Sequence, residues 1–379
     1  MKYKVIFAFL CMAQFCVARE IRVHEGQSIQ AAVDQAQPGD RVMVESGRYH
    51  EAGRPCPSQP SVSCAVVVTS DNITLAGVPE DGRPVLIENP GGQDAGIEVA
   101  SPRSAAVECV NNPAARVHGS VIASFTVNGF NGSGIRLVCV DDWLIAFNSA
   151  NNNAEYGIFP VKSGFGRIHH NVATGANDTG VYVGQSHDVR ADHNLASGNV
   201  SGFEIENSTN VRMDHNEAFG NTGGILVFIL PGRAVLTGLN NLVDHNSVHD
   251  NNRDNTCLNP ADEVCLVPPG SGILVVAGTG TVIEHNDVLG NETFGVAVSD
   301  FCTPFQVPAA FCSADFLGFD PLPENTRVVA NVAKGNGTNS QFPGVPGADL
   351  FWTGLGSGNC WQGNRADTEF PSPLPSCKQ

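Results

Sequence analysis

The 379-residue sequence lacks several features that identify common protein classes. No long apolar run follows residue 18, which excludes a membrane-spanning helix there. The 21 basic residues are outnumbered by 38 acidic ones and form no visible basic face, which excludes a protein that binds nucleic acid by neutralising phosphates. The HExxH metal motif, the GxSxG nucleophile motif and phosphate-binding loops are also missing.

The first 18 residues are typical of a cleavable signal peptide. Lys2 and Lys4 precede a short apolar stretch, and Ala18 provides a small residue for cleavage. The formal net charge of −17 becomes −19 when these two lysines are removed with the signal. We therefore predict a secreted or periplasmic protein that starts near Arg19.

Ten cysteines remain after the signal segment, and no CxxC pair occurs among them. An even number of cysteines in an exported chain predicts disulfides, and zinc binding is the weaker alternative in an oxidising compartment. Four pairs lie close in sequence and a fifth pair is left over: Cys56 with Cys64, Cys257 with Cys265, Cys302 with Cys312, Cys360 with Cys377, and Cys109 with Cys139.

A repeat of 22 or 23 residues runs through the centre of the chain. Hydrophobic residues lie one and three positions after each repeated glycine, as Val181 and Val183 follow Gly180, which is the alternation of a β-strand. A second short strand follows about ten residues later, and no helix intervenes. The repeated glycines are Gly134, Gly157, Gly180, Gly202, Gly224, Gly272 and Gly295.

Repeats of this length stack as coils, so we predict an all-β fold, a single-domain right-handed parallel β-helix solenoid over residues 19–338. An amphipathic helix at 28–36 is expected to cap its N-terminal end, and the segment 339–379, which carries a disulfide, is expected to form a C-terminal cap. The longer cysteine-bearing segments 251–270 and 301–325 are expected to project on one side of the coil stack.

Several segments resemble a family of exported bacterial parallel β-helix repeat proteins within the pectin-lyase-like superfamily. These are Tyr156-Gly-Ile-Phe-Pro-Val161, Gly180-Val-Tyr-Val-Gly-Gln-Ser186, Gly202-Phe-Glu-Ile-Glu-Asn-Ser208 and Asn221-Thr-Gly-Gly-Ile-Leu-Val-Phe228. The resemblance covers roughly residues 19–336 and implies the fold, whereas the closest family implies no activity. More distant members include pectate lyases, mannuronan epimerases and a periplasmic copper-maturation protein.

Two departures from the family pattern bear on function. Family members usually read Asp-Leu-Pro where this chain reads Ile229-Leu230-Pro231, so an acid is missing there. The Asp-Pro-His-Asp motif of the epimerases is replaced by Ile158-Phe-Pro-Val161. The second departure argues against an epimerase assignment.

Residues two and four positions after each glycine are predicted to point outward, and the polar ones among them are the candidate site. Tyr182 or Lys162 could be a catalytic base, and Glu204 and Glu206 could be the acid and nucleophile of a glycosidase. In a lyase, Arg136 or a divalent cation such as calcium, held by the two glutamates, would neutralise a uronate carboxylate. The expected substrate-binding residues are Arg136, Phe159, Gln185, Asn207, His187 and Asp188. The alternative is a structural face that hydrogen-bonds to a covering loop.

The second strand carries further columns of identical residues. Arginines at 167, 190 and 212 stack beside Asp192, Asp214 and Asp244, which predicts a lattice of salt bridges in preference to an ion-binding ladder. Histidines at 170, 193, 215, 245 and 285 each precede an asparagine at a turn. We expect these histidines to point inward and fill the corners of the coils, in preference to binding a transition metal such as copper.

The sequence thus predicts an exported β-helix protein that binds or modifies extracellular polysaccharide, with lyase-like or epimerase-like action on uronate-type glycans. The alternative is a non-catalytic periplasmic or surface scaffold, a partner of an electron-transfer or metal-maturation system. Whether the protein is an enzyme stays open at this level, and its cofactor is unknown. We expect a monomer that does not bind nucleic acid and that has no membrane-spanning segment.

Overall fold

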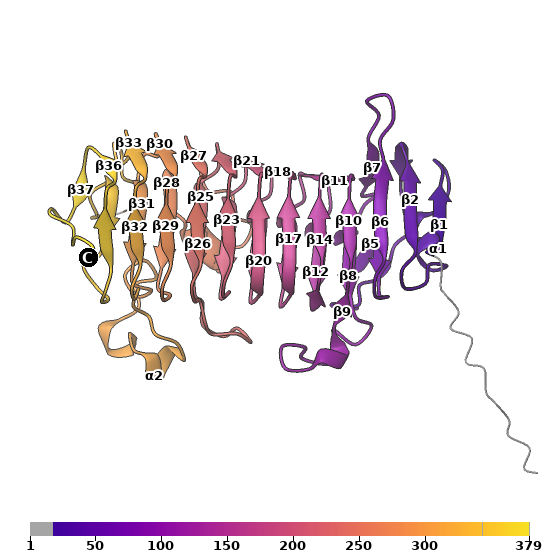
Figure 1. Ribbon diagram of the computed structural model, residues 1–379, viewed down its shortest axis with the longest axis horizontal. Helices are drawn as coiled ribbons and strands as arrows, with labels where there is room; N and C mark the ends of the chain where they lie inside the picture. The colour runs from indigo at the N-terminus through magenta and orange to yellow at the C-terminus, as the bar shows by residue number, and fades with distance from the viewer. Residues whose placement is uncertain (1–17, 343, 379) are drawn as a thin grey trace, which may run out of the picture.

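The computed structural model describes residues 18–342 and 344–378, so the predicted signal peptide lies almost wholly outside the described residues. The chain forms an elongated solenoid in which successive coils follow one another from end to end (Figure 1). Three sheets run the length of the solenoid, here named sheets A, B and C. None of the helices in the described part of the chain has the length and apolar character that crossing a membrane requires.

Each sheet receives one strand from nearly every coil. Sheet A contains β1 (Glu20–Val23), β2 (Arg41–Glu45), β6 (Thr74–Val78), β10 (Val121–Ala123), β14 (Leu144–Ala146), β17 (Gly164–His169), β20 (His187–Asp192), β23 (Arg212–Asp214), β26 (Leu242–Asp244), β29 (Val282–Glu284), β32 (Arg327–Val329) and β35 (Cys360–Gln362), with β9 (Val117–His118) and β13 (Val140–Asp141) beside them. Sheet B contains β3 (Gly47–Tyr49), β7 (Val85–Glu88), β11 (Thr126–Asn128), β15 (Ser149–Asn151), β18 (Val172–Thr174), β21 (Leu195–Ser197), β24 (Glu217–Phe219), β27 (Ser247–His249), β30 (Asp287–Leu289), β33 (Val332–Lys334) and β36 (Arg365–Ala366). Sheet C contains β4 (Arg54–Pro55), β5 (Ser63–Val68), β8 (Ala95–Ala100), β12 (Ser133–Val138), β16 (Tyr156–Val161), β19 (Thr179–Gly184), β22 (Ser201–Glu206), β25 (Gly223–Phe228), β28 (Ser271–Val276), β31 (Phe294–Ser299), β34 (Ala348–Trp352) and β37 (Glu369–Phe370).

The sequence repeat sets the register between coils. Val181 of β19 pairs with Phe203 of β22, and Phe203 pairs with Ile225 of β25, so each residue lies beside its equivalent in the next coil. These ladders are parallel, and the terminal β4–β5 pair is antiparallel. The inward residues of the three sheets form one continuous core along the axis, which includes Phe203 and Ile205.

The N-terminal helix is shorter than the sequence predicts. Helix α1 spans Ile29–Val33, and the hydroxyl of Ser28 accepts a hydrogen bond from the backbone N–H of Ala31 at its start. Its Ile29 and Val33 are buried in the main core at the end of the solenoid where β1 is the last strand of sheet A (Figure 1).

Two ladders of buried asparagines bind the coils to one another. In one ladder the side-chain oxygen of Asn216 accepts hydrogen bonds at 3.0 Å from both the backbone and the side chain of Asn194. The amide of Asn216 then donates to Asn246 at 3.0 Å and to the carbonyl of Ala191 at 2.9 Å. A parallel ladder runs through Asn199, Asn221, Asn251, Asn291 and Asn336.

The histidines that precede the first asparagine ladder point outward, so the prediction that they fill the corners of the coils was wrong. The left-handed backbone at these positions, with φ near 56° at His193 and His215, turns the asparagine inward and leaves the histidine outside. Their rings stack at 5.0 to 5.2 Å along the axis. Beside them Arg190 pairs with Asp214 at 2.7 Å in the predicted salt-bridge lattice.

Excursions from the coils carry most of the disulfides. The five predicted pairs are all bonded in the structure: Cys56 with Cys64, Cys109 with Cys139, Cys257 with Cys265, Cys302 with Cys312, and Cys360 with Cys377. The 3₁₀-helices η1 (Pro113–Ala115), η2 (Glu263–Leu266) and η3 (Ala309–Phe311) and helix α2 (Ala314–Leu317) lie in these excursions.

The segment from residue 339, where the sequence predicts a C-terminal cap, extends the three sheets. It adds β34, β35, β36 and β37 to the three sheets, because its strands continue the parallel ladders. Cys377 follows the last of these strands, and its bond to Cys360, with Cα atoms 4.7 Å apart, ties the chain end to β35 of sheet A. The backbone N–H of Trp361 donates to the carbonyl of Pro375 at 2.8 Å beside this disulfide. The disulfide of Cys377 therefore fastens the end of the solenoid itself and does not staple an independent cap.

Candidate functional site

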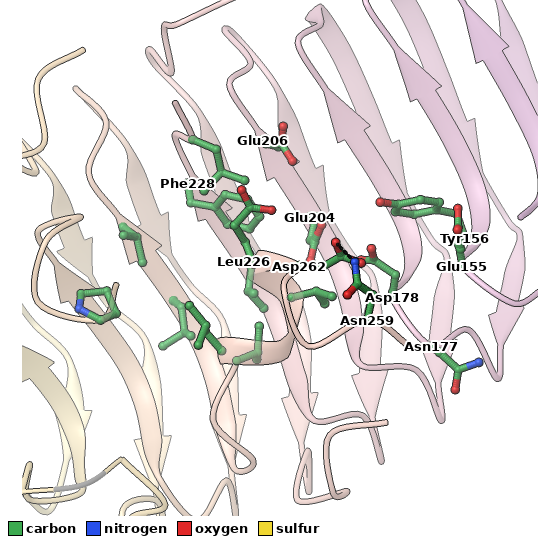
Figure 2. Close-up of a pocket in the computed structure, with 18 of the residues that line it drawn as sticks. Glu155, Tyr156, Asn177, Asp178, Glu204, Glu206, Leu226, Phe228, Asn259 and Asp262 are labelled. Carbon is green, nitrogen blue, oxygen red and sulfur yellow. Dashed lines mark hydrogen bonds between the residues drawn. The ribbon is translucent and has the colours of Figure 1, made fainter. Parts of the chain in front are cut away.

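A pocket of about 470 Å³ opens on the outer face of sheet C, over strands β16 to β28 (Figure 2). Its floor consists of outward side chains of the strands, and its walls come from the segment after β25 and from the excursions 251–270 and 301–325. Acidic residues line one end, and Leu226, Phe228 and Phe305 belong to a largely apolar remainder. The acidic lining residues are Glu155, Asp178, Glu204, Glu206, Asp262 and Glu263.

The excursion after β27 forms one wall of the pocket. Cys257 and Cys265 close it into a short loop, and the guanidinium of Arg253 donates a hydrogen bond to the carbonyl of Gly198 on the coil. Val267 packs with Leu226 in an apolar cluster outside the main core. Because of this cover, the outward side chains of β22 and β25 are buried although they point away from the core.

The segment after β25 forms a second wall and is fixed by two residues that the sequence predicts to bind substrate. The side-chain amide of Asn207 donates to the carbonyls of Leu230 at 2.9 Å and Val235 at 2.7 Å. The side-chain oxygen of Gln185 accepts a hydrogen bond at 2.9 Å from the backbone of Ala234. Asn207 is fully buried, so it positions the loop and does not line the pocket.

Asp178 and Glu204 form a pair of carboxyls with raised pKa values. Glu204 is only 3% exposed, and burial, together with the charge of Asp178, raises its pKa well above the ordinary value. Asp178 lies in the turn before β19, and burial raises its pKa to about 7. Because burial disfavours the charged form of a carboxyl, Asp178 is partly protonated near neutral pH.

Glu206 has a partner that the other two carboxyls lack. The guanidinium of Arg233 donates to it at 2.7 Å, and Arg233 also lies 3.6 Å from Glu263. Burial raises the pKa of Glu206, and the charge of Arg233 opposes this shift. Arg233 thus offsets part of the negative charge at one side of the pocket.

Two tyrosines stand among these acids. Burial raises the pKa of Tyr182 well above its ordinary value, as do the charges of Glu206 and Glu204, so the phenol stays protonated at neutral pH and can act as a donor. A Cβ at Gly184 would collide with the Tyr182 ring, so the glycine makes room for that ring along the strand. Burial and Asp178 likewise raise the pKa of Tyr156.

The predicted site residues therefore separate into two groups. Tyr182, Glu204 and Glu206 are brought together, and Phe159 stacks on Tyr182 with ring centres 4.5 Å apart. The others are engaged elsewhere. Arg136 pairs with Asp94 at 2.5 Å and Glu98 at 2.6 Å, Lys162 pairs with Glu108 at 2.7 Å, and His187 lies 3.0 Å from Asp188 on sheet A.

The pocket acids do not converge on a single metal position. Among the described residues, the groups of three close ligand atoms are Cys56, Cys64 and Glu98, and Asp300, Cys302 and Cys312. Both contain disulfide sulfurs, which are poor ligands because metal binding requires thiolates. The sequence suggested that Glu204 and Glu206 could hold a calcium ion in a lyase. Neither residue belongs to these groups of close ligand atoms among the described residues.

Comparison with known proteins decides the class of fold. A family model described as "Right handed beta helix region" matches residues 96–228. The chain is a right-handed parallel β-helix protein. This confirms the fold that the repeat and the resemblance predicted. A search of curated proteins found no match.

Solved structures similar to this β-helix protein cover most of it at low identity. The Azotobacter vinelandii mannuronan C-5 epimerase AlgE6 A-module is 18% identical, with a TM-score of 0.60 over 90% of this chain and 86% of that one. A double mutant of the periplasmic alginate epimerase AlgG is 15% identical, with a TM-score of 0.54 over 93% and 73%. A mutant DFA-IIIase from Arthrobacter chlorophenolicus A6 in complex with DFA-III is 14% identical, with a TM-score of 0.55 over 91% and 84%.

Reasoning from the sequence of this β-helix protein missed Asp178, Tyr156, Arg233 and Asp262. The outward columns were counted from the repeated glycine forward, whereas Asp178 lies two positions before Gly180. A signal for Asp178 existed: it is the acid in the turn that leads into the same strand as Tyr182. Arg233 and Asp262 lie in excursions whose direction no repeat specifies.

Proposed function

We propose that the protein is an exported enzyme that binds a polysaccharide in the pocket over sheet C and cleaves a glycosidic bond there. The observation that carries this proposal is the pair Asp178 and Glu204, two carboxyls with raised pKa values that line the same pocket of about 470 Å³. Glycoside hydrolysis needs one carboxyl that gives a proton and one that is ionised, and a pair in which Asp178 titrates near neutral pH can supply both.

In the proposed reaction, the protonated carboxyl of the pair gives its proton to the leaving glycosidic oxygen. The ionised partner then assists attack by water or stabilises the positive charge that develops on the sugar ring. Tyr156 lines the pocket and keeps its proton, so its phenol can hydrogen-bond to a sugar beside Asp178, while Tyr182 is buried behind the lining and supports Glu206. The apolar wall with Leu226 and Phe228 can pack against the carbon face of a sugar.

The charge of the pocket distinguishes between classes of polysaccharide. A uronate carries a carboxylate, and the pocket presents six acids against the single arginine Arg233, which already contacts Glu206 and Glu263. The related solved structures include enzymes named for mannuronan and alginate, both of which consist of uronates. For this chain we favour a polysaccharide without carboxylates, because like charges in a buried site repel.

Export accords with this function. The signal-like segment and five disulfides support a secreted or periplasmic location. There the pocket would meet polymers outside the cell. A protein without turnover or binding would instead be the non-catalytic scaffold that the sequence allowed.

A panel of purified glycans tests the proposal. Incubation of the mature protein with neutral, amino-substituted and uronate polysaccharides is expected to release new reducing ends from a polymer without carboxylates. Products that contain an unsaturated uronate would instead indicate a lyase. If no polymer is cut or bound, the enzyme proposal fails and the scaffold alternative is favoured.

The raised pKa of Asp178 predicts how stability depends on pH. The folded protein keeps this proton up to about pH 7, whereas the unfolded chain releases it near 3.8. Between these values the unfolded state binds fewer protons, so this group makes the free energy of unfolding fall as pH rises. Asp178→Asn removes the effect and is expected to be more stable than the native chain by about 2–4 kcal/mol above pH 7, and equally stable below pH 4.

Urea unfolding at a series of pH values checks this expectation. Asp315→Asn, an exposed acid in α2, serves as the control for the loss of one charge. Parallel pH curves for the native chain and Asp178→Asn would contradict the assignment of a raised pKa to this carboxyl.

A further inference from the structure

The buried acids of this protein receive donors of two kinds, arginines or neutral amide and hydroxyl groups, and the pocket pair lacks the arginine. On sheet A, Asp192, Asp214 and Asp244 each accept a pair of hydrogen bonds from an arginine. Near the C-terminus, Asp349 accepts hydrogen bonds from Asn336 and Thr368, and Asp178 of the pocket accepts one at 2.9 Å from the hydroxyl of Thr179. The rule in this fold is therefore that a buried carboxylate receives strong donors.

Asp178 and Glu204 have no cationic partner. Among residues 18–342 and 344–378, no arginine, lysine or histidine forms an ion pair with either. Glu204 is 97% buried yet lines the pocket, so its carboxyl is directed at space that a ligand can fill. A buried polar group without a matching charge is costly unless a ligand provides one.

The wall formed by the excursion 251–270 adds a further acid to the end of the pocket that already holds Asp178 and Glu204, although like charges repel. Asp262 of the excursion 251–270 lines the same end of the pocket as Asp178 and Glu204 (Figure 2). Glu155 also lies at this end, and burial together with the charge of Asp94 raises its pKa. Catalysis requires two carboxyls, so Glu155 and Asp262 are a surplus of negative charge that the proposed reaction does not use.

We propose that the pocket recognises a positively charged amino sugar, a hexosamine residue whose amino group carries no acyl substituent, within the polysaccharide. The ammonium group would lie between the carboxyls of the floor and Asp262, since its three N–H donors suit several surrounding oxygens. This inference rests on the proposed function, because it names the class of sugar that the same pocket binds.

The remaining lining residues favour a sugar over other cations. Asn177 offers an amide group and Tyr156 a phenol, both of which suit the hydroxyls of a sugar ring, while Asn259 donates to Asp262 at 2.9 Å and holds that carboxylate in place. A polyamine has no hydroxyls to use them. A calcium ion needs six to eight oxygens at about 2.3–2.6 Å, and the pocket carboxyls do not converge in that way.

Calorimetric binding to two matched oligosaccharide series tests the inference. Oligomers of glucosamine and of N-acetylglucosamine differ in the charged amino group, and we expect the glucosamine series to bind at least about tenfold more tightly. Asp262→Asn and Glu155→Gln are expected to reduce that preference by about tenfold each, because both remove surplus charge and keep the shape of the side chain. Asp315→Asn, with the same change of charge in another excursion, should leave the preference unchanged.

The outcomes separate this inference from the proposed function. Equal binding of both series overturns the inference, while cleavage of a neutral polymer that depends on Glu204 would leave the proposed function intact. Tight binding of glucosamine oligomers without cleavage supports the inference and contradicts the enzyme. Equally tight binding of spermine or trilysine, or calcium binding that Asp262→Asn abolishes, would show that the pocket takes another cation and would overturn the inference.

Discussion

Glu204→Gln is expected to lower turnover of a cleavable glycan by about 10²–10⁴-fold, the range that a positioned acid or base contributes. Glutamine keeps the size of the side chain but has no carboxyl proton to transfer, whereas the raised pKa of Glu204 favours its protonated form. The fold should not suffer, because the substitution removes a buried carboxyl whose raised pKa reports the cost of its ionisation. Loss of activity with retained or increased stability is the combination that identifies a group used for chemistry.

The measurement is initial rate against substrate concentration, together with the thermal unfolding midpoint of each variant. Glu80→Gln provides the matched control, since Glu80 is exposed and lies outside the pocket. A variant at Glu204 that retains full turnover would show that the pair is not the catalytic group. A variant with a lower unfolding midpoint would show instead that Glu204 has a structural role.

Asn216→Ala is expected to produce the largest loss of stability of any single substitution considered. It removes the acceptor of two hydrogen bonds from Asn194 and the donor to Ala191 and Asn246. The backbone N–H of Asn194 and the carbonyl of Ala191 would remain buried without these partners. Each such group costs about 1–3 kcal/mol, so a decrease of at least about 3 kcal/mol in the free energy of unfolding is expected.

Chemical denaturation of Asn216→Ala and Asn339→Ala gives the comparison. Asn339 is an exposed asparagine whose side chain donates to Glu292, so its loss should cost little. Similar stabilities of the two variants would show that the ladder is not a main source of cohesion between coils. Asn216→Asp is expected to be destabilised as well, because the carboxylate keeps the acceptor but loses the donor.

The sequence was sufficient for the fold because the repeat encodes it directly. Gly180, Gly202 and Gly224 mark equivalent points of successive coils, and the alternation after each of them assigns Phe203 and Ile205 to the core. The orientation of the histidines was not predicted, since it depends on the left-handed backbone of His193 and its equivalents. The alternation of hydrophobic residues along a strand carries no information about the left-handed turn at these histidines.

The C-terminal end shows a second limit of sequence reasoning. The pairing of Cys360 with Cys377 was predicted from their proximity in the chain and is confirmed. The short strands between them have no glycine repeat to mark them, so the continuation of the solenoid to Cys377 was not predicted. Spacing of cysteines thus indicated the bond but not the element that the bond secures.

The site was only partly accessible from the sequence, because it is built where the repeat is interrupted. Glu204 and Glu206 interrupt two outward columns that are otherwise largely apolar, and they were found for that reason. Their burial was not predictable, because it results from the path of the excursion 251–270 over the strand. Lys162 and Arg136 were equally plausible from their positions, yet each is paired with an acid supplied by a distant part of the chain.

The excursion 251–270 begins and ends at almost the same point, since the backbone N–H of Gly270 donates to the carbonyl of Asn251 at 2.8 Å. The coil below would therefore close in the same way around a longer, shorter or unrelated insertion. Residues such as Asp262 can be exchanged together with their loop, provided that the new loop also covers Leu226 as Val267 does. The protein is accordingly suited to engineering by loop transplantation, in which the coils are kept and the excursion 251–270 is replaced to change specificity.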